Sequence, residues 1–304
     1  MKKVLVIAGP TASGKSAFAV EAAHEFGGEI ISGDSIQVYR GLDIGSGKVT
    51  EAEKQGIPHH LIDILSPSEP YSVSDFQRNA RACIAAIPFP IIAGGTGLYL
   101  KACLYDYTFV PEEETGTDRE LEMLDSRTLY ERLKETDPIS AEKIHPNNRR
   151  RVLRALTVAK RSGMAKSEIE AAQKHEPVYD FFIAGCTMDR AVLYERISAR
   201  VEQMFRNGLE DEVKRLLSEG VTFEDPAMKG IGYREFEPYI KGECSIGEVQ
   251  KMIAQHSRNY AKRQYTWLNH QMPVHWFNAL DQNARHEMME VIRVWKETEN
   301  EKEN

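Results

Sequence analysis

The sequence contains no long apolar run. No stretch approaches the roughly 18 consecutive apolar residues that a membrane-spanning helix needs, so we expect no membrane contact. The first ten residues, "MKKVLVIAGP", carry two lysines, but Gly9 and Pro10 interrupt the short apolar run behind them. This pattern indicates a first β-strand rather than a signal peptide, and it favours a cytoplasmic protein.

Cysteine and net positive charge are also scarce. The four cysteines, Cys83, Cys103, Cys186 and Cys244, are far apart and form no CxxC pair. Their spacing gives no sign of a zinc site and favours reduced thiols. The formal net charge of -7 excludes a globally basic nucleic-acid-binding protein, but it is compatible with a local basic surface.

Strands and helices alternate in the first third of the chain. Val4 to Ala8 is continuous and apolar, which predicts a buried parallel strand, and a helix is predicted from Lys15 to Glu25. "GEIISGDS" and the segment from Pro90 to Ala93 predict two further strands. This alternation predicts an α/β fold with a parallel sheet. Each strand ends in a polar or glycine-rich motif, so we expect these motifs to meet at the carboxyl edge of the sheet, where ligands bind.

The pattern changes near Pro111. An acidic, turn-prone stretch begins there, and the following segments are amphipathic and helical until "DFFIAGCTM" predicts another strand. We interpret residues 111–178 as a helical insertion domain, and residues 1–110 with 179–304 as the α/β core. Beyond Asp189 the chain is predicted to be helical again.

A phosphate-binding motif follows the first strand. "GPTASGKS" matches G-x-x-x-x-G-K-[ST] and comprises Gly9, Pro10, Thr11, Ala12, Ser13, Gly14, Lys15 and Ser16. Its glycines permit a tight turn with inward-pointing amides, the next helix adds its positive end, and Lys15 can reach phosphate oxygens. The Ser16 hydroxyl can ligate Mg²⁺. The expected fold class is therefore α/β, with a P-loop NTPase-like parallel sheet core and a helical insertion domain.

The loop alone leaves two chemistries open. In a kinase or NTPase it would hold the β- and γ-phosphates of a nucleotide, and the bond to the γ-phosphate would break. In another kind of transferase it would hold a diphosphate, and a different bond would break. A second motif, "SGDSIQVYRGLDIGSGK", places Asp34 at the end of the second strand. Taken by itself, Asp34 could also be a helix N-cap or a metal-ligand carboxylate.

Seven motifs occur in one order along the chain. They are "GPTASGKS", "GDSIQVYRGLDIGSGK", "GIPHHLID", "GGTGLYLKA", "RRVLRAL", "KGIGYRE" and "YAKRQYTWL". Together they resemble the bacterial tRNA dimethylallyltransferases, also called tRNA isopentenyltransferases, over a span from about Val4 to Trp267. A P-loop alone is widespread, whereas the ordered set is specific.

The resemblance implies a reaction and its catalytic residues. Members of this family transfer a dimethylallyl group from dimethylallyl diphosphate to N6 of the adenine 3′ of the anticodon, in tRNAs that read codons beginning with U. The loop would then bind the leaving diphosphate together with Mg²⁺. By resemblance, Asp34 is the general base, Thr96 lies near the amine and the bridging oxygen, and Arg200 approaches the diphosphate from the opposite side.

The resemblance also implies where tRNA binds. The anticodon stem-loop would contact a set of polar, basic and glycine residues: Asp34, Ser35, Ile36, Gln37, Thr96, Arg119, Arg150, Arg151, Arg154, Lys229, Gly232, Tyr233 and Arg234. The basic run "NNRRRVLRALTVAKR" agrees with this expectation, because Arg150 and Arg154 share one helix face. The glycines of "KGIGYR" would let the backbone approach RNA closely. We expect a monomer.

Three other functions would also use a P-loop. A small-molecule or nucleotide kinase explains the P-loop but not the arginine-rich insertion. An enzyme that prenylates free adenine nucleotides, and an RNA-binding GTPase-like switch, are the further alternatives. His59 and His60 are not expected to bind a metal, because adjacent side chains point in different directions.

Overall fold

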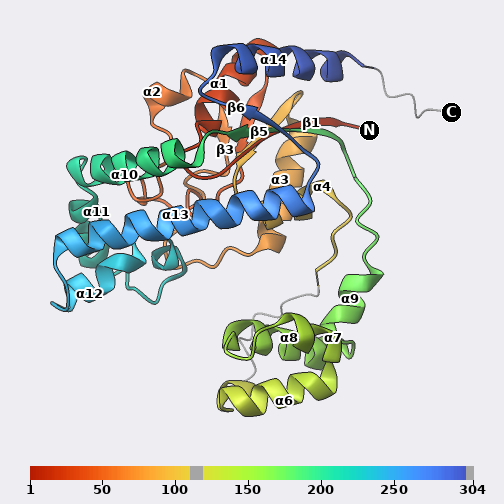
Figure 1. Cartoon of the computed structure of the whole chain (residues 1–304), viewed down its shortest axis with the longest axis vertical. Helices are drawn as coiled ribbons and strands as arrows, with labels where there is room; N and C mark the ends of the chain where they lie inside the picture. The colour runs from red at the N-terminus through yellow and green to blue at the C-terminus, as the bar shows by residue number, and fades with distance from the viewer. Residues whose placement is uncertain (110–118, 299–304) are drawn as a thin grey trace. The chain divides into compact units, whose positions relative to one another are not determined.

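The computed structural model describes residues 1–109 and 119–298, in two compact units (Figure 1). Unit 1 comprises Met1–Leu104 and Val178–Asn304, and unit 2 comprises Tyr105–Pro177. The chain therefore leaves the α/β unit after Leu104 and returns to it at Val178, whereas the sequence predicts the insertion over residues 111–178. The acidic stretch predicted to begin at Pro111 lies mostly outside the described residues.

Unit 1 is built on a six-stranded parallel sheet. Its strands are β1 (Lys3–Ala8), β2 (Glu29–Ser32), β3 (His59–His60), β4 (Pro90–Gly94), β5 (Asp180–Thr187) and β6 (Val274–Asn278). Their order is β3-β2-β4-β1-β5-β6, and all adjacent pairs are parallel. The predicted α/β fold is confirmed. Since β2, β4 and β1 are neighbours, the motifs that follow them share one edge of the sheet.

The helices of unit 1 connect and cover these strands. They are α1 (Lys15–Phe26), α2 (Glu51–Lys54), α3 (Val73–Ala86), α4 (Gly97–Leu104), α10 (Arg190–Arg206), α11 (Leu209–Ser218), α12 (Glu237–Ile240), α13 (Ile246–Gln271) and α14 (Gln282–Glu297), with 3-10 turns η1 (Pro226–Lys229) and η2 (Arg234–Phe236). No helix in the described ranges is long and apolar enough to cross a membrane.

Two of the apolar cores of unit 1 lie next to the elements that carry the site. In the first, α1 and α14 pack against the sheet, and Phe18 of α1 contacts Phe277 of β6 with ring centroids 4.6 Å apart. In the second, side chains of α10, α11 and α13 surround the segment that contains Val38 and Leu42. Burial of such side chains stabilises each core by about 1.5–3 kcal/mol per large residue. The second core fixes the chain that follows β2, which carries Asp34.

Unit 2 is helical and has a separate core. Its helices are α5 (Arg119–Glu122), α6 (Ser126–Thr136), α7 (Pro138–Lys143), α8 (Arg149–Ser162) and α9 (Lys166–Ala172). Leu129, Leu133, Val152 and Ala155 are fully buried in it. Asn148 caps α8 by accepting a hydrogen bond from the amide of Arg151, and Gly163 ends the helix in a left-handed conformation.

The predicted element bounds hold within a few residues, with one clear error. The region beyond Asp189 contains β6 and is not entirely helical. Val274–Asn278 is short and follows a 26-residue helix, so its apolar residues read as a continuation of helical periodicity. Pairing with β5 supplies the backbone hydrogen bonds that make this segment a strand.

Candidate active site

The phosphate-binding loop lies between β1 and α1. Ala12 and Gly14 both adopt left-handed backbone, with φ of 64° and 87°. At Gly9, with φ 153°, a Cβ atom would lie 2.7 Å from the carbonyl oxygen of Cys186, so the close approach to β5 requires glycine. The Ser13 hydroxyl is buried and has no hydrogen-bond partner in the described part of the chain. These features fit a loop whose amides and hydroxyl pair with phosphate oxygens.

Lys15 supplies the positive charge of this loop. Burial lowers the pKa of its ammonium to about 8; Arg200 lowers it further, while Asp34 and Cys186 oppose the shift. Its Nζ atom is 3.4 Å from the Pro10 carbonyl oxygen. An anion bound beside Lys15 would raise this pKa again, because an opposite charge favours the protonated form.

One pocket, with about 650 Å³ of empty space, collects residues from several distant segments. The loop contributes Thr11, Lys15 and Ser16, the segment after β2 contributes Asp34 and Gln37, and α10 contributes Arg200. The predicted convergence of the strand-end motifs on one site is confirmed by this lining.

The position of Asp34 is fixed by its own turn. Its Oδ1 accepts hydrogen bonds from the backbone amides of Ile36 at 2.8 Å and Gln37 at 3.3 Å. Both bonds use the same oxygen, so in the described part of the chain Oδ2 is left for a substrate. Ser35 and Ile36 belong to this turn and are not among the residues that line the pocket.

Helix α10 brings two arginines to the site. Arg196 donates from Nε to the Ala12 carbonyl oxygen at 3.0 Å, and Arg200, one turn later, lies in the pocket wall. Burial lowers the pKa of Arg200, and Asp34 and then Glu53 oppose the shift. A guanidinium remains charged in proteins, so Arg200 and Lys15 together make a positive end of the pocket. The sequence motifs do not single out Arg196, although its spacing of four from Arg200 places both on one helix face.

Helix α13 contributes two residues to which the sequence motifs assign no role. Gln264 is buried, and its Oε1 accepts the amide of Thr11 at 2.9 Å. Tyr260 lies one turn earlier in the same pocket wall. Burial raises the pKa of Tyr260 and Asp34 adds to the rise, while the nearby side chains of Thr96, Arg263 and Gln264 oppose it. Thr96, immediately before α4, is not among the residues that line the pocket.

The segment "KGIGYR" differs from its expected role. Lys229 and Arg234 are exposed, whereas Gly232 and Tyr233 are buried, so the prediction that these two contact tRNA directly is corrected. A Cβ atom at Gly232 would lie 2.8 Å from the carbonyl oxygen of Gly45. The close backbone approach that these glycines permit is thus made to another segment of the protein.

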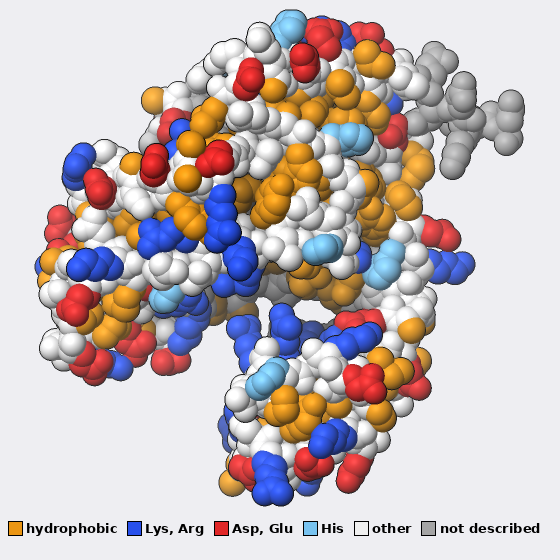
Figure 2. Space-filling view, in the orientation of Figure 1, with side chains coloured by type: hydrophobic (Ala, Val, Ile, Leu, Met, Phe, Trp, Pro, Cys, Tyr) orange, Lys and Arg blue, Asp and Glu red, His pale blue; other side chains and the backbone are white. Residues whose placement is uncertain are grey.

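The predicted arginines of unit 2 lie on its surface. Arg150, Arg151 and Arg154 are exposed on α8, and Arg119 is exposed at the start of α5. Figure 2 shows Lys and Arg side chains over α8 in this unit, and others over α13 in unit 1. Arg149 differs from its neighbours, because it donates to the carbonyl oxygens of Leu124 and Glu122 and so supports the fold of the unit.

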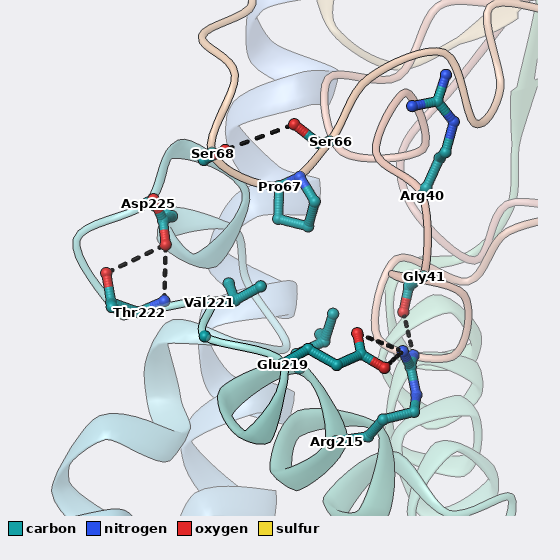
Figure 3. A pocket seen from close by; sticks show the side chains of 12 residues that line it. Arg40, Gly41, Ser66, Pro67, Ser68, Arg215, Glu219, Val221, Thr222 and Asp225 are labelled. Carbon is teal, nitrogen blue, oxygen red and sulfur yellow. Dashed lines mark hydrogen bonds and ion pairs between the residues drawn. The ribbon is translucent and has the colours of Figure 1, made fainter.

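A second hollow lies beside α11, and Figure 3 shows its lining. Arg215 donates to the carbonyl oxygen of Gly41 at 2.8 Å and pairs with Glu219 at 3.1 Å. Arg40 donates to the Ile64 carbonyl oxygen at 3.0 Å. Both arginines are engaged by protein oxygens, and the hollow contains none of the predicted site residues. We therefore assign the chemistry to the pocket that contains Lys15 and Asp34.

The two histidines predicted not to bind a metal have protein partners. His59 Nδ1 is 2.8 Å from the Ile57 carbonyl oxygen, and His60 Nε2 is 2.6 Å from the Glu29 carboxylate. Across residues 1–109 and 119–298, no group of three or more His, Cys, Asp or Glu side chains is arranged to hold a metal ion. His59 also lines the pocket.

The fold and the site define a P-loop protein in which a carboxylate lies in the same pocket as the phosphate-binding loop. A family model for IPP transferase matches residues 37–271, and a model for isopentenyl transferase matches residues 2–64. The chain belongs to the IPP transferase family.

Individual relatives agree with this assignment. A tRNA dimethylallyltransferase of Anoxybacillus flavithermus is 47% identical over 285 residues, which cover 92% of this chain and 91% of the relative. The crystal structure of a tRNA delta(2)-isopentenylpyrophosphate transferase from Staphylococcus epidermidis is similar, with 43% identity, a TM-score of 0.71 and coverage of 97% and 98% of the two chains. A eukaryotic dimethylallyltransferase acting on tRNA is 29% identical, with a TM-score of 0.85 over 100% of this chain and 82% of that one.

Proposed function

We propose that this protein transfers a dimethylallyl group from dimethylallyl diphosphate to N6 of the adenine 3′ of the anticodon, in tRNAs that read codons beginning with U, and releases diphosphate. The observation that carries the proposal is the shared pocket, in which Asp34 lies with Lys15, Ser16 and Arg200. Family membership and the names of the relatives supply the reaction class.

The positive end of the pocket suits a leaving diphosphate. An allylic diphosphate breaks its carbon–oxygen bond more readily when the negative charge that develops on the departing group is stabilised. Lys15, Arg200 and the loop amides are fixed in place before the reaction, so they stabilise that charge without rearranging. No phosphoryl group is transferred in this scheme.

Ser16 is proposed to hold Mg²⁺ together with the diphosphate. Its hydroxyl lies in the pocket wall, and an oxygen ligand of this kind suits a cation that keeps several waters and binds substrate phosphates. The metal, when bound, neutralises part of the diphosphate charge. The protein side of this task is to orient the Ser16 hydroxyl toward the phosphates from the first turn of α1.

The five-carbon group requires apolar surface between the two polar ends. The pocket provides it through a set of small and branched side chains: Ala19, Ile30, Val49, Ile62 and Ala93. The sequence alone does not identify these residues, because they come from separate segments that only the sheet brings together. Their contact with the allyl group would exclude water from the carbon that is attacked.

The acceptor amine is proposed to meet Asp34. The N–H of the adenine becomes acidic as the new carbon–nitrogen bond forms, so a carboxylate is a sufficient base. The turn engages Oδ1, so Oδ2 is the oxygen proposed for this task. Thr96 is proposed to lie near the amine and the bridging oxygen, and Gln37 is proposed to contact the target nucleotide. The adenine must leave the stacked anticodon loop to reach them.

tRNA is proposed to bind to basic surface on both units. The proposed contacts in unit 2 are Arg119, Arg150, Arg151 and Arg154, and those on the surface of unit 1 are Lys229 and Arg234. The extracted nucleotide is proposed to meet a further set in unit 1: Asp34, Ser35, Ile36, Gln37 and Thr96. One chain carries every proposed contact, so a monomer suffices. A cytoplasmic location is proposed, in keeping with a tRNA substrate.

The test is a transfer assay with dimethylallyl diphosphate, Mg²⁺ and unmodified tRNA, followed by nucleoside analysis of the digested RNA. We expect prenylated adenosine without added ATP. Phosphate transfer from ATP with no prenylated adenosine would indicate a kinase and overturn the proposal. Modification of free AMP but not of tRNA would place the protein among enzymes that act on adenine nucleotides, and tight triphosphate binding without turnover would indicate a switch.

A further inference from the structure

A buried carboxylate on α11 gathers the backbone of one loop of the pocket. Glu212 is 7% exposed and accepts the amides of Asp43 at 3.0 Å, Ile44 at 2.8 Å and Gly45 at 3.0 Å. It also accepts the hydroxyl of Tyr233 at 2.7 Å. That hydroxyl oxygen in turn accepts the amide of Ser46 at 3.1 Å. Four consecutive amides of the Asp43–Ser46 segment are thus held by one carboxylate–phenol pair.

The pair is rigid because it is enclosed. Tyr233 is fully buried, and its ring would lie 2.5 Å from a Cβ atom at Gly45, so the loop and the ring are in close contact. Burial raises the pKa of Tyr233 well above its ordinary value, and the nearby Glu212 adds to the rise. The phenol therefore stays protonated and donates to Glu212. A buried carboxylate is costly unless every oxygen is hydrogen-bonded, and here both oxygens are.

The next residue of the loop touches the active site. The Gly47 carbonyl oxygen lies 3.4 Å from Nη2 of Arg200 and 3.4 Å from Nε2 of Gln37. Ser46 and Gly47 are both part of the pocket wall. A Cβ atom at Gly47 would be 1.6 Å from the Arg200 guanidinium. The path of this loop therefore decides where Arg200 can lie.

We propose that Glu212 is a positioning residue for the transfer reaction, which acts through the Asp43–Gly47 loop to hold Arg200 at the diphosphate end of the pocket. This inference rests on the proposed function. Apolar contacts in the second core already attach α11 to the segment after β2. What the carboxylate adds is a fixed orientation of the loop amides, which apolar packing does not supply.

The experiment is a double-mutant cycle with Glu212→Gln and Arg200→Ala. Glutamine is similar in size but replaces one acceptor oxygen with a donor that faces amide hydrogens. We expect Glu212→Gln to lower kcat for tRNA prenylation about 10- to 100-fold, because small displacements of charged groups have effects of this size. KM for tRNA should stay unchanged. In the Arg200→Ala background the same substitution should cost less than about threefold.

Glu210 provides a matched control on the same helix. Its carboxylate also accepts a tyrosine hydroxyl, that of Tyr239 at 2.8 Å, but it forms none of the bonds to the Asp43–Ser46 amides. Glu210→Gln should retain the wild-type rate. If Glu210→Gln lowers kcat as much as Glu212→Gln does, the loss reflects general destabilisation of α11. That result would overturn the inference.

Tyr233→Phe keeps the cycle informative if Glu212→Gln does not fold. This variant removes only the hydroxyl that joins Ser46 to Glu212, and it should show a smaller loss that also disappears in the Arg200→Ala background. If the loss in kcat caused by Glu212→Gln or Tyr233→Phe is as large in the Arg200→Ala background as in the wild-type background, the proposal is overturned. Wild-type rates in both Glu212→Gln and Tyr233→Phe would overturn it as well. Absence of prenyl transfer by the wild-type protein would instead refute the proposed function. In that case, calorimetry of inorganic diphosphate binding in the same variants would still measure the coupling between Glu212 and Arg200.

Discussion

Raising the pH from 7 to 9 removes the proton from the Lys15 ammonium, whereas an ordinary lysine stays charged over this range. With a pKa of about 8, about nine tenths of the free protein carries the Lys15 charge at pH 7, and about one tenth does so at pH 9. Diphosphate binds the protonated form more tightly, because the charge lies in the loop that holds it. The affinity should therefore be highest below pH 8 and fall about tenfold between pH 7 and pH 9.

Calorimetry with inorganic diphosphate measures this effect directly. At pH 8, binding should take up about half a proton, since a bound anion raises the pKa of Lys15 and completes its protonation. The uptake is obtained by repeating the titration in buffers of different ionisation enthalpy. The sign follows from the direction of the shift: a pKa lowered in the free protein and raised in the complex gives proton uptake on binding.

Lys15→Arg is the control, because arginine keeps its charge across this range. Its pH dependence measures the titration of diphosphate and of the remaining site. Wild-type affinity should fall about tenfold more steeply than that of the variant. Parallel curves, together with no proton uptake by the wild-type protein at pH 8, would refute the assignment of a depressed pKa to Lys15.

Three further changes test the remaining parts of the site. Asp34→Asn preserves the acceptor oxygen of the turn but removes the base, so turnover should fall about 100-fold or more while diphosphate affinity is retained; a wild-type rate would remove Asp34 from the chemistry. Gly47→Ala would place a methyl group on Arg200 and should weaken diphosphate binding about tenfold, whereas Gly56→Ala, with φ of 80° and open space around it, should cost only about 1 kcal/mol of stability. Similar binding by both alanine variants would contradict this reasoning. Arg150→Ala with Arg154→Ala should reduce the slope of log affinity for tRNA against log salt by up to about 2, and Arg132→Ala on α6 should leave it unchanged; an unaltered slope in the double variant would make α8 an ordinary surface helix.

The sequence predicts those parts of the site that are local. The phosphate loop is defined by eight consecutive residues, and the end of a strand gives the place of Asp34 in the pocket. The role of Asp34 as a base is implied only by the resemblance. Gln264 and Glu212 act across separations of 253 and 167 to 169 residues. Helical periodicity shows that such residues lie on a buried face, but only the packed structure shows which amides they accept.

The two errors have the same physical origin. The strand Val274–Asn278 and the burial of Tyr233 both depend on partners that are distant in the chain, β5 in one case and the Asp43–Ser46 segment in the other. Local propensity carries no information on either partner. The prediction for "KGIGYR" is right that its glycines permit close approach and wrong about which molecule approaches.

The two points at which unit 2 joins unit 1 are adjacent. The amide of Val178 donates to the carbonyl oxygen of Leu104 at 2.9 Å, and Tyr105 pairs with Pro177 immediately beyond. The chain therefore enters and leaves unit 2 at one place, where the two segments of unit 1 are already hydrogen-bonded to each other. Because the ends of the core stay joined at this place, a change in the length of unit 2 would leave the α/β unit closed, as for an insertion at a surface site.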